Sequence, residues 1–128
     1  MYKKLLVGLV LLSMFTLLLA ACGIEKPASI GAGGPSVKMG TNAFLQASIT
    51  VPKGKTLTLI DSAAAPHIIQ NGSWVNGTAK TTTESGAPTL NMSFSGSDTQ
   101  ATPPFTTAGT FHIYCTIHSG MNLTVIVQ

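Results

Sequence analysis

Charge is scarce in this sequence, and arginine is absent. Charged residues make up 9% of the 128 residues, and the formal net charge of +3 comes from seven lysines against four acids. Two of these lysines precede a long apolar run, and from Cys22 onward five lysines face four acids, which leaves a net charge of +1. Proteins that bind nucleic acid gather Lys and Arg into basic patches, and this sequence has no such patch. The composition therefore argues against a nucleic-acid partner.

Helical periodicity is missing as well. No apolar pattern of helical spacing lasts longer than one turn, and no segment of the sequence repeats. What the sequence does contain is 13 Gly and many Thr, Ser, Val and Ile, which favour strands and the turns between them. A chain of 128 residues suffices for one domain. We therefore expect an all-β fold, a Greek-key β-sandwich of seven to eight strands.

The first 21 residues have the pattern of an export signal. A short basic start precedes residues 5–21, which are continuous and mostly apolar. This run ends in Leu19-Ala20-Ala21-Cys22, which resembles the bacterial lipobox, in which the Cys is lipidated and the signal is cut just before it. An uncleaved membrane helix is the alternative, because the 17 residues of the run are at the lower limit for a span. Both interpretations place the rest of the chain outside the cytoplasmic membrane and anchored to it.

A linker and one domain are expected to follow. Residues 22–35 are rich in Gly, Pro and Ala and cannot bury enough apolar surface to order themselves. A flexible chain of that length spans about 20 Å root-mean-square, so the domain can turn above the membrane. Residues 36–128 are expected to form the folded domain, which is long enough for a single core.

Strand patterns are clear at both ends of this domain and weaker in its middle. Asn71-Gly72-Ser73 is expected to be a turn, residues 74–88 a long loop with at most a short strand, and residues 96–104 another loop. Alternation of apolar and polar residues predicts strands over residues 37–39, 48–51, 56–60, 67–70, 90–94, 109–115 and 122–127.

Metal-ligating residue types gather in one short stretch. Cys115, His118 and Met121 fall within seven residues between two predicted strands, and His67 follows Pro66 in a loop upstream. Two His nitrogens and one Cys sulfur in a trigonal plane, with a weak axial Met sulfur, form a blue-copper electron-transfer site. Spacing alone leaves chance open, since a buried Cys is often only a small hydrophobe. The position of the loop between two strands favours the metal site.

Cysteine usage agrees with that interpretation. The sequence has only two cysteines, and lipidation would occupy Cys22. No intramolecular disulfide is then left for Cys115, although an oxidising compartment favours disulfides. A free thiol outside the cell is reactive unless it is bound to something, and binding to copper would meet this need.

With these residues the chain resembles the cupredoxin family, and most of all its plastocyanin-like and amicyanin-like members with a short Cys-x2-His-x2-Met loop. The resemblance implies one type-1 copper ion held by His67, Cys115, His118 and Met121, with the electron passing through His118. No open position for a substrate is expected at such a site, so the protein should carry one electron and not be an enzyme by itself. Redox partner proteins and a monomeric state are expected.

The other candidate ligands are assigned to packing or to the surface. His112 alternates away from Cys115 along its strand and is expected at the surface. Met39 and Met92 lie in predicted strands and should pack in the core, and Trp74 should be a packing anchor.

Two positions depart from the family pattern. Ile117 stands where many short-loop members have Pro, so a further backbone N–H is available to the Cys115 sulfur, and such bonds tune the potential. Ile68 stands where plastocyanin-like members often have Asn. The polar tie between the ligand loops is then either made by other groups or absent.

Three other functions use the same residues or the same fold. An extracytoplasmic copper carrier or buffer would need the same ligands. A thiol enzyme would use Cys115 and His118 as nucleophile and base, although no orienting acid is identifiable. A metal-free adhesion sandwich would need none of them.

Overall fold

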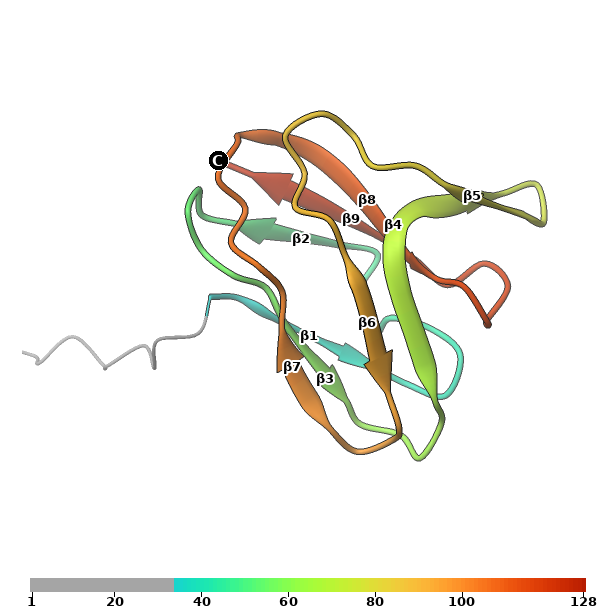
Figure 1. The fold of residues 1–128 in the computed structure, drawn as a ribbon. Helices are drawn as coiled ribbons and strands as arrows, with labels where there is room; N and C mark the ends of the chain where they lie inside the picture. The colour runs from blue at the N-terminus through green and yellow to red at the C-terminus, as the bar shows by residue number, and fades with distance from the viewer. Residues whose placement is uncertain (1–33) are drawn as a thin grey trace, which may run out of the picture. The chain divides into compact units, whose positions relative to one another are not determined.

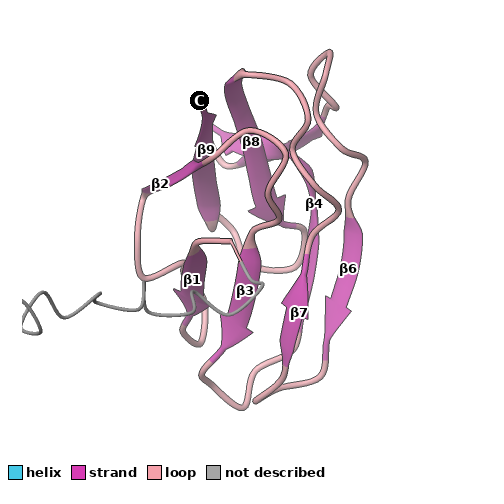
Figure 2. Ribbon diagram, turned by 90° about the vertical axis from the view of Figure 1, so that its left-hand side faces the viewer, coloured by secondary structure: helices cyan, strands magenta, loops and turns pink. Residues whose placement is uncertain are grey.

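The structure is a computed structural model in which residues 34–128 are described (Figure 1). The expected export signal (1–21), the lipidation site Cys22 and the linker up to residue 33 lie outside the described residues. Residues 34–128 form nine strands. Figure 2 shows strands and loops without a helix, and these residues contain no helix that could cross a membrane. The all-β prediction is confirmed, with one strand more than the seven to eight expected.

Most strands alternate between buried and more exposed residues, as expected when one face of a strand packs on a core. In β9, for example, Leu123, Val125 and Val127 are buried and the residues between them are less so. The nine strands are β1 (Ser36–Met39), β2 (Ser48–Val51), β3 (Thr58–Asp61), β4 (His67–Val75), β5 (Thr78–Thr81), β6 (Asn91–Phe94), β7 (Thr99–Ala101), β8 (Gly109–Cys115) and β9 (Asn122–Val127).

The strands form two sheets that share one core. One sheet has the order β1-β3-β7, and the other has the order β2-β9-β8-β4-β5, with β6 also paired to β4. Figure 1 shows β9 between β2 and β8. The pairs β1/β3 and β2/β9 are parallel, and the other pairs are antiparallel. A single apolar cluster takes side chains from both sheets, including Met39 and Leu59 from the first and Ile69, Ile113 and Val125 from the second. This shared core makes the fold a β-sandwich.

The turn predicted at Asn71-Gly72-Ser73 is wrong, because β4 runs through it. The strand pairs with β8 as far as Asn71 and with β5 from Gly72 onward. Gly72 has φ +124°, and a Cβ there would lie 2.1 Å from the carbonyl oxygen of Lys80. Only glycine fits so close to β5, and this allows the strand to exchange one partner for another without ending.

Asn71 is buried, and its side chain joins two segments by hydrogen bonds instead of forming a turn. Its Nδ2 donates to the carbonyl oxygen of Pro88 (3.0 Å), and its Oδ1 accepts from the backbone N–H of Leu90 (2.6 Å). These bonds fasten the segment that leads into β6 onto β4.

Residues 74–88 do contain one short strand, β5, as the sequence allowed. Val75 pairs with Thr78 across a two-residue turn, in which Asn76 has φ +50° and Gly77 has φ +75°. Positive φ at both positions is the type I′ geometry for which Asn-Gly is preferred. Residues 96–104, predicted as a loop, include the three-residue strand β7, which the pairing with β3 stabilises.

Candidate metal centre

Strand pairing brings the candidate ligands to one end of the sandwich. His67 is the first residue of β4, and Cys115 is the last residue of β8. The two strands are antiparallel, and Ile69 lies opposite Cys115. Residues opposite each other share a face of the sheet, as do residues two apart on one strand. His67 and Cys115 therefore point to the same, buried face.

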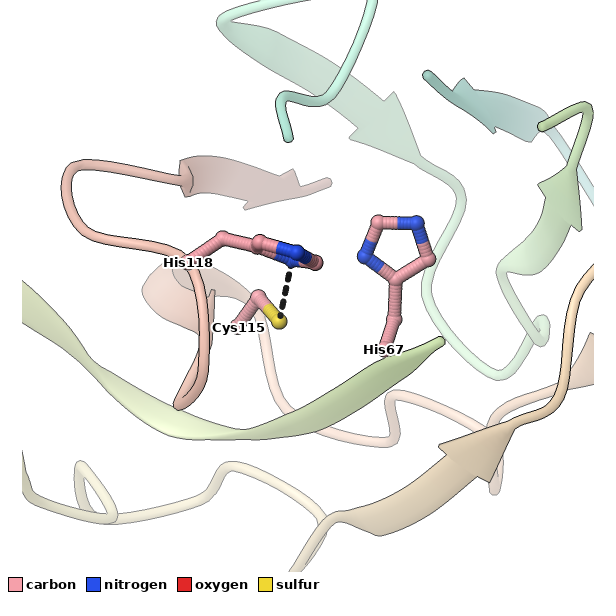
Figure 3. Close-up of side chains that lie close together, drawn as sticks. All are labelled: His67, Cys115 and His118. Carbon is pink, nitrogen blue, oxygen red and sulfur yellow. Dashed lines mark hydrogen bonds between the residues drawn. The ribbon is translucent and has the colours of Figure 1, made fainter. Parts of the chain in front are cut away.

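The three side chains converge in Figure 3. One ligating atom from each of His67, Cys115 and His118 can be chosen so that all lie within 4.8 Å of one another. Sγ of Cys115 is 3.4 Å from Nδ1 of His118, and the rings of His67 and His118 are 4.9 Å apart between centroids at an angle of 62°. Within residues 34–128, no other group of three His, Cys, Asp or Glu side chains is arranged to hold a metal ion.

Backbone hydrogen bonds fix the loop that carries His118. The N–H of Cys115 donates to the carbonyl oxygen of Met121 (3.0 Å), and the N–H of Met121 donates to that of His118 (3.2 Å). The N–H of Thr116 donates to the carbonyl oxygen of Ile68 (2.8 Å), which joins the loop to β4. The tie between the two ligand segments, left open by the absence of Asn at position 68, is thus made by the backbone.

Trp74 adds a contact that the sequence did not indicate. Its Nε1–H donates to the carbonyl oxygen of Cys115 (2.8 Å), and its ring packs edge-on against Tyr114 with centroids 6.3 Å apart. Asn122 holds the Trp74 backbone, accepting from its N–H (2.7 Å) and donating to its carbonyl (3.0 Å). Trp74 is therefore a packing residue that also fixes the backbone of Cys115. The partners are 41 and 48 positions apart, so no local pattern could have shown this.

Burial leaves His67 suited to hold a metal ion. His67 and Cys115 are fully buried, Met121 is 1% exposed and His118 is half-buried. Both ring nitrogens of His67 lack a hydrogen-bond partner in the protein. Burial lowers the pKa of His67 from its ordinary value of 6.5, against an opposing effect of Asp61. His67 is thus held neutral, which is the form that binds metals.

The donor atoms also fit one copper ion. A soft thiolate with imidazole nitrogens favours copper among the common metals. Three donors that surround one ion in a plane lie about 3.5–3.8 Å from each other when their bonds to the ion are about 2.0–2.3 Å, the values for zinc. The donor atoms lie within 4.8 Å of one another and would have to approach by about 1 Å to share an ion.

The remaining candidates lie where the sequence placed them. The His112 side chain is 46% exposed, and its Nδ1 lies 2.6 Å from Oε1 of Glu84. Met39 is fully buried in the core, and Met92 packs against it. Ile117 is 47% exposed beside His118. The hydrogen bond from the Ile117 N–H to the Cys115 sulfur stays a prediction.

A β-sandwich that brings a Cys and two His together at one end defines a copper protein of the cupredoxin class. Residues 33–128 match the profile of the family described as copper binding proteins, plastocyanin/azurin family. The chain belongs to this plastocyanin/azurin family, and its cofactor is one copper ion. A comparison with curated proteins by sequence finds no match.

Solved structures of amicyanin are similar in fold. Amicyanin from Paracoccus versutus (Thiobacillus versutus) is 21% identical, with a TM-score of 0.56 over 79% of this chain and 87% of its own. The oxidised state of an amicyanin variant in which one proline is replaced by alanine is 25% identical, with a TM-score of 0.57 over 79% and 88%. The reduced Cu(I) form, at pH 4, of a variant with a proline replaced by glycine is 22% identical, with the same TM-score over the same shares.

Proposed function

We propose that this protein is a type-1 (blue) copper electron-transfer protein that is anchored to the outer face of the bacterial cytoplasmic membrane. In this proposal His67, Cys115 and His118 would hold the ion, with Met121 as a fourth, weaker ligand, and the protein is a monomer that exchanges one electron with redox partner proteins. The convergence of three donor side chains, two of them fully buried, is the observation that carries the proposal. When bound, copper supplies a reversible one-electron couple.

The chain holds the proposed copper ligands in fixed positions, most of them buried. The bonds from Cys115 to Met121, from Thr116 to Ile68 and from Trp74 to Cys115 fasten the loop to the end of β8 and to β4. Side chains held in this way keep their positions whichever charge the ion carries. Little rearrangement on electron transfer is what a carrier requires.

The same geometry argues against catalysis by this protein alone. His67, Cys115 and Met121 are buried, so a substrate could approach only past His118. Hydrolytic and oxygen chemistry at metals uses an open coordination position, and four protein donors leave none. We therefore assign no enzymatic activity to the protein. The half-buried His118, beside the exposed Ile117, is the place for electron exchange with a partner.

The membrane anchor rests on the sequence. Leu19-Ala20-Ala21-Cys22 follows an apolar run of the length of an export signal. Mass spectrometry of the mature N-terminus, from protein made in a bacterial host, should find a lipidated Cys22. Cys22→Ala should remove the lipid and impair processing. An unmodified Cys22, or cleavage at another position, would refute the anchor but not the copper site.

The function itself is tested with the copper-loaded full-length protein in detergent. One copper per chain and an intense visible Cu(II)–thiolate band are expected, and Cys115→Ser should remove the band. A colourless copper-loaded protein would contradict the proposal. The rates of electron exchange and of copper release distinguish this function from that of a copper carrier or buffer. An electron-transfer protein exchanges electrons quickly between oxidised and reduced copies and releases copper slowly to a chelator. A copper carrier or buffer exchanges electrons slowly and releases copper quickly.

A further inference from the structure

A second ionisable side chain is buried beside His67. Asp61 is the last residue of β3, and neither its side chain nor that of His67 has any exposed surface. Oδ1 of Asp61 lies 3.8 Å from Nε2 of His67. Among residues 34–128, His67 is the one basic side chain within ion-pair distance of this carboxylate.

The hydrogen bonding of both side chains is incomplete. Oδ1 of Asp61 accepts from the backbone N–H of Ala63 (3.1 Å), but Oδ2 has no partner, and neither ring nitrogen of His67 has one. An unpaired charge inside a protein is costly, and a buried acceptor without a donor costs about 1–3 kcal/mol. An Asn or Ser at position 61 could accept the same bond from the Ala63 N–H, so this bond does not require a charged residue. The buried charge therefore points to a role toward His67.

The orientation of the imidazole supplies that role. In Figure 3 one ring nitrogen of His67 faces Cys115 and His118, and the other points away from them. Nε2 is the nitrogen near Asp61, so Nδ1 is the one that faces the donor cluster. A ring with its proton on Nε2 has its lone pair on Nδ1, directed at the position of a metal ion. A carboxylate next to Nε2 favours this tautomer.

We propose that Asp61 is a positioning residue of the copper site, which accepts the Nε2–H of His67, fixes the Nδ1 lone pair toward the ion, and lowers the reduction potential through its negative charge. The inference rests on the proposed role of His67 as a ligand. The 3.8 Å separation is longer than a hydrogen bond and would have to shorten by less than 1 Å. A full negative charge near the site stabilises Cu(II) more than Cu(I), because the oxidised ion has the higher charge.

Another acceptor competes for the same proton. The backbone of Gly40 lies near His67 and, like Asp61, acts to raise its pKa. A backbone carbonyl there would fix the same tautomer but would add no net charge. The reduction potential separates the two acceptors.

The decisive variant is Asp61→Asn, with Asp98→Asn as the matched control. Asparagine keeps the shape and an oxygen that can accept from Ala63, but it removes the negative charge and puts an NH2 group in place of the other oxygen. Asp98 is the other carboxylate whose charge acts on His67, and its effect is the weakest of the causes that shift the His67 pKa. Oδ1 of Asp98 is also buried without a partner, although Asp98 as a whole is half-buried and its Oδ2 accepts from Nε2 of Gln100 (3.3 Å).

The potential should rise in Asp61→Asn and change much less in Asp98→Asn. Loss of such an outer partner typically weakens metal binding about 10–100-fold, and we expect Cu(II) to be affected more than Cu(I). Each tenfold excess in the loss for Cu(II) corresponds to about 59 mV. Equal shifts in the two variants, or no shift in either, would overturn the charge effect.

A readout without copper tests the positioning itself. Nitrogen chemical shifts of His67 in the apo-protein should show the Nε2–H tautomer in the wild type and a mixture of tautomers in Asp61→Ala. The Nδ1–H tautomer in the wild type, or an unchanged tautomer in Asp61→Ala, would refute the contact. If Asp61→Ala does not fold, Asp61→Asn still decides through the potential. Absence of the visible copper band in the wild type would reject the proposed function and leave the tautomer result standing.

Discussion

His67 and His112 lie on neighbouring strands of one sheet, β4 and β8, and their surroundings differ in burial and in bonding. His67 is fully buried, and both of its ring nitrogens lack a partner in the protein. His112 is 46% exposed and has its Nδ1 bonded to Glu84. A satisfied surface imidazole needs no further partner. A buried imidazole without a partner is available to a metal ion, which is the role we propose for His67.

Deleting each imidazole in turn tests the assignment of the two histidines most directly. Loss of a residue that only hydrogen-bonds to a ligand weakens metal binding up to about 100-fold. His67→Ala should weaken Cu(II) binding by more than this, and should perturb or remove the visible band. His112→Ala should leave the band and the potential nearly unchanged. Copper titration and visible spectra of the two variants decide it. A large change in His112→Ala would mean that the ligands are misassigned.

The methionines allow a similar test, because Met121, the proposed ligand, and Met39 both belong to the buried apolar cluster. Met121→Leu keeps the volume, so its cost should stay below about 1.5 kcal/mol, but it removes the sulfur that favours Cu(II). The potential should rise while the colour persists, because the Cys115 thiolate causes the colour. Met39→Leu, in the core, and Met92→Leu, beside it, are the controls. A potential in Met121→Leu equal to that of the controls would show that Met121 is not the axial ligand.

A third measurement uses the apo-protein and pH. Because burial lowers the pKa of His67, the unfolded chain binds more protons than the folded one between that lowered pKa and the ordinary value of 6.5. Stability is therefore complete above about pH 6.5, falls as the pH decreases, and stops falling below the folded-state pKa. Thermal unfolding between pH 8 and 5 should show this slope, and His67→Gln should reduce it. A slope that is the same in His67→Gln would assign it to another group.

The smallest effect is expected at the His112–Glu84 pair. Half-exposed ion pairs contribute about 0.2–1 kcal/mol, and salt screens them. A double-mutant cycle with His112→Ala and Glu84→Ala, measured by denaturant unfolding, should give a coupling energy in that range. The coupling should shrink in high salt. A coupling energy above about 2 kcal/mol would contradict the view that this pair contributes little to stability.

Local patterns were sufficient to predict that the loop between β8 and β9 brings His118 close to Cys115. Cys115, His118 and Met121 are close in sequence, and strand alternation on both sides marks the loop between them. His112 was excluded as a ligand by the same alternation, which holds in β8 from Phe111 to Ile113. Residues of this kind are predictable because their positions depend on neighbours within a few residues.

Features that depend on distant partners were not predictable. Gly72 has the sequence context of a turn, but pairing with β5 keeps it inside β4. The three residues of β7 form a strand because β3 is beside them. Asp61 gave no signal, since its burial against His67 appears only when β3 and β4 are placed together. The bond from Trp74 to Cys115 spans 41 positions for the same reason.

The parallel pairing of β2 with β9 has a consequence for how the chain folds. Ser48 pairs with Thr124, 76 positions later, so this contact closes a very large loop. Sheets built from such distant partners fold slowly, on the order of milliseconds to seconds, because the entropy of closure is lost before the contacts form. The loop with Cys115, His118 and Met121 directly precedes β9. That loop joins two strands adjacent in sequence, whereas His67 reaches it only when β4 pairs with β8, as at Ile69 and Cys115. His67 should therefore join Cys115 and His118 late in folding, and until then the thiol lacks this imidazole.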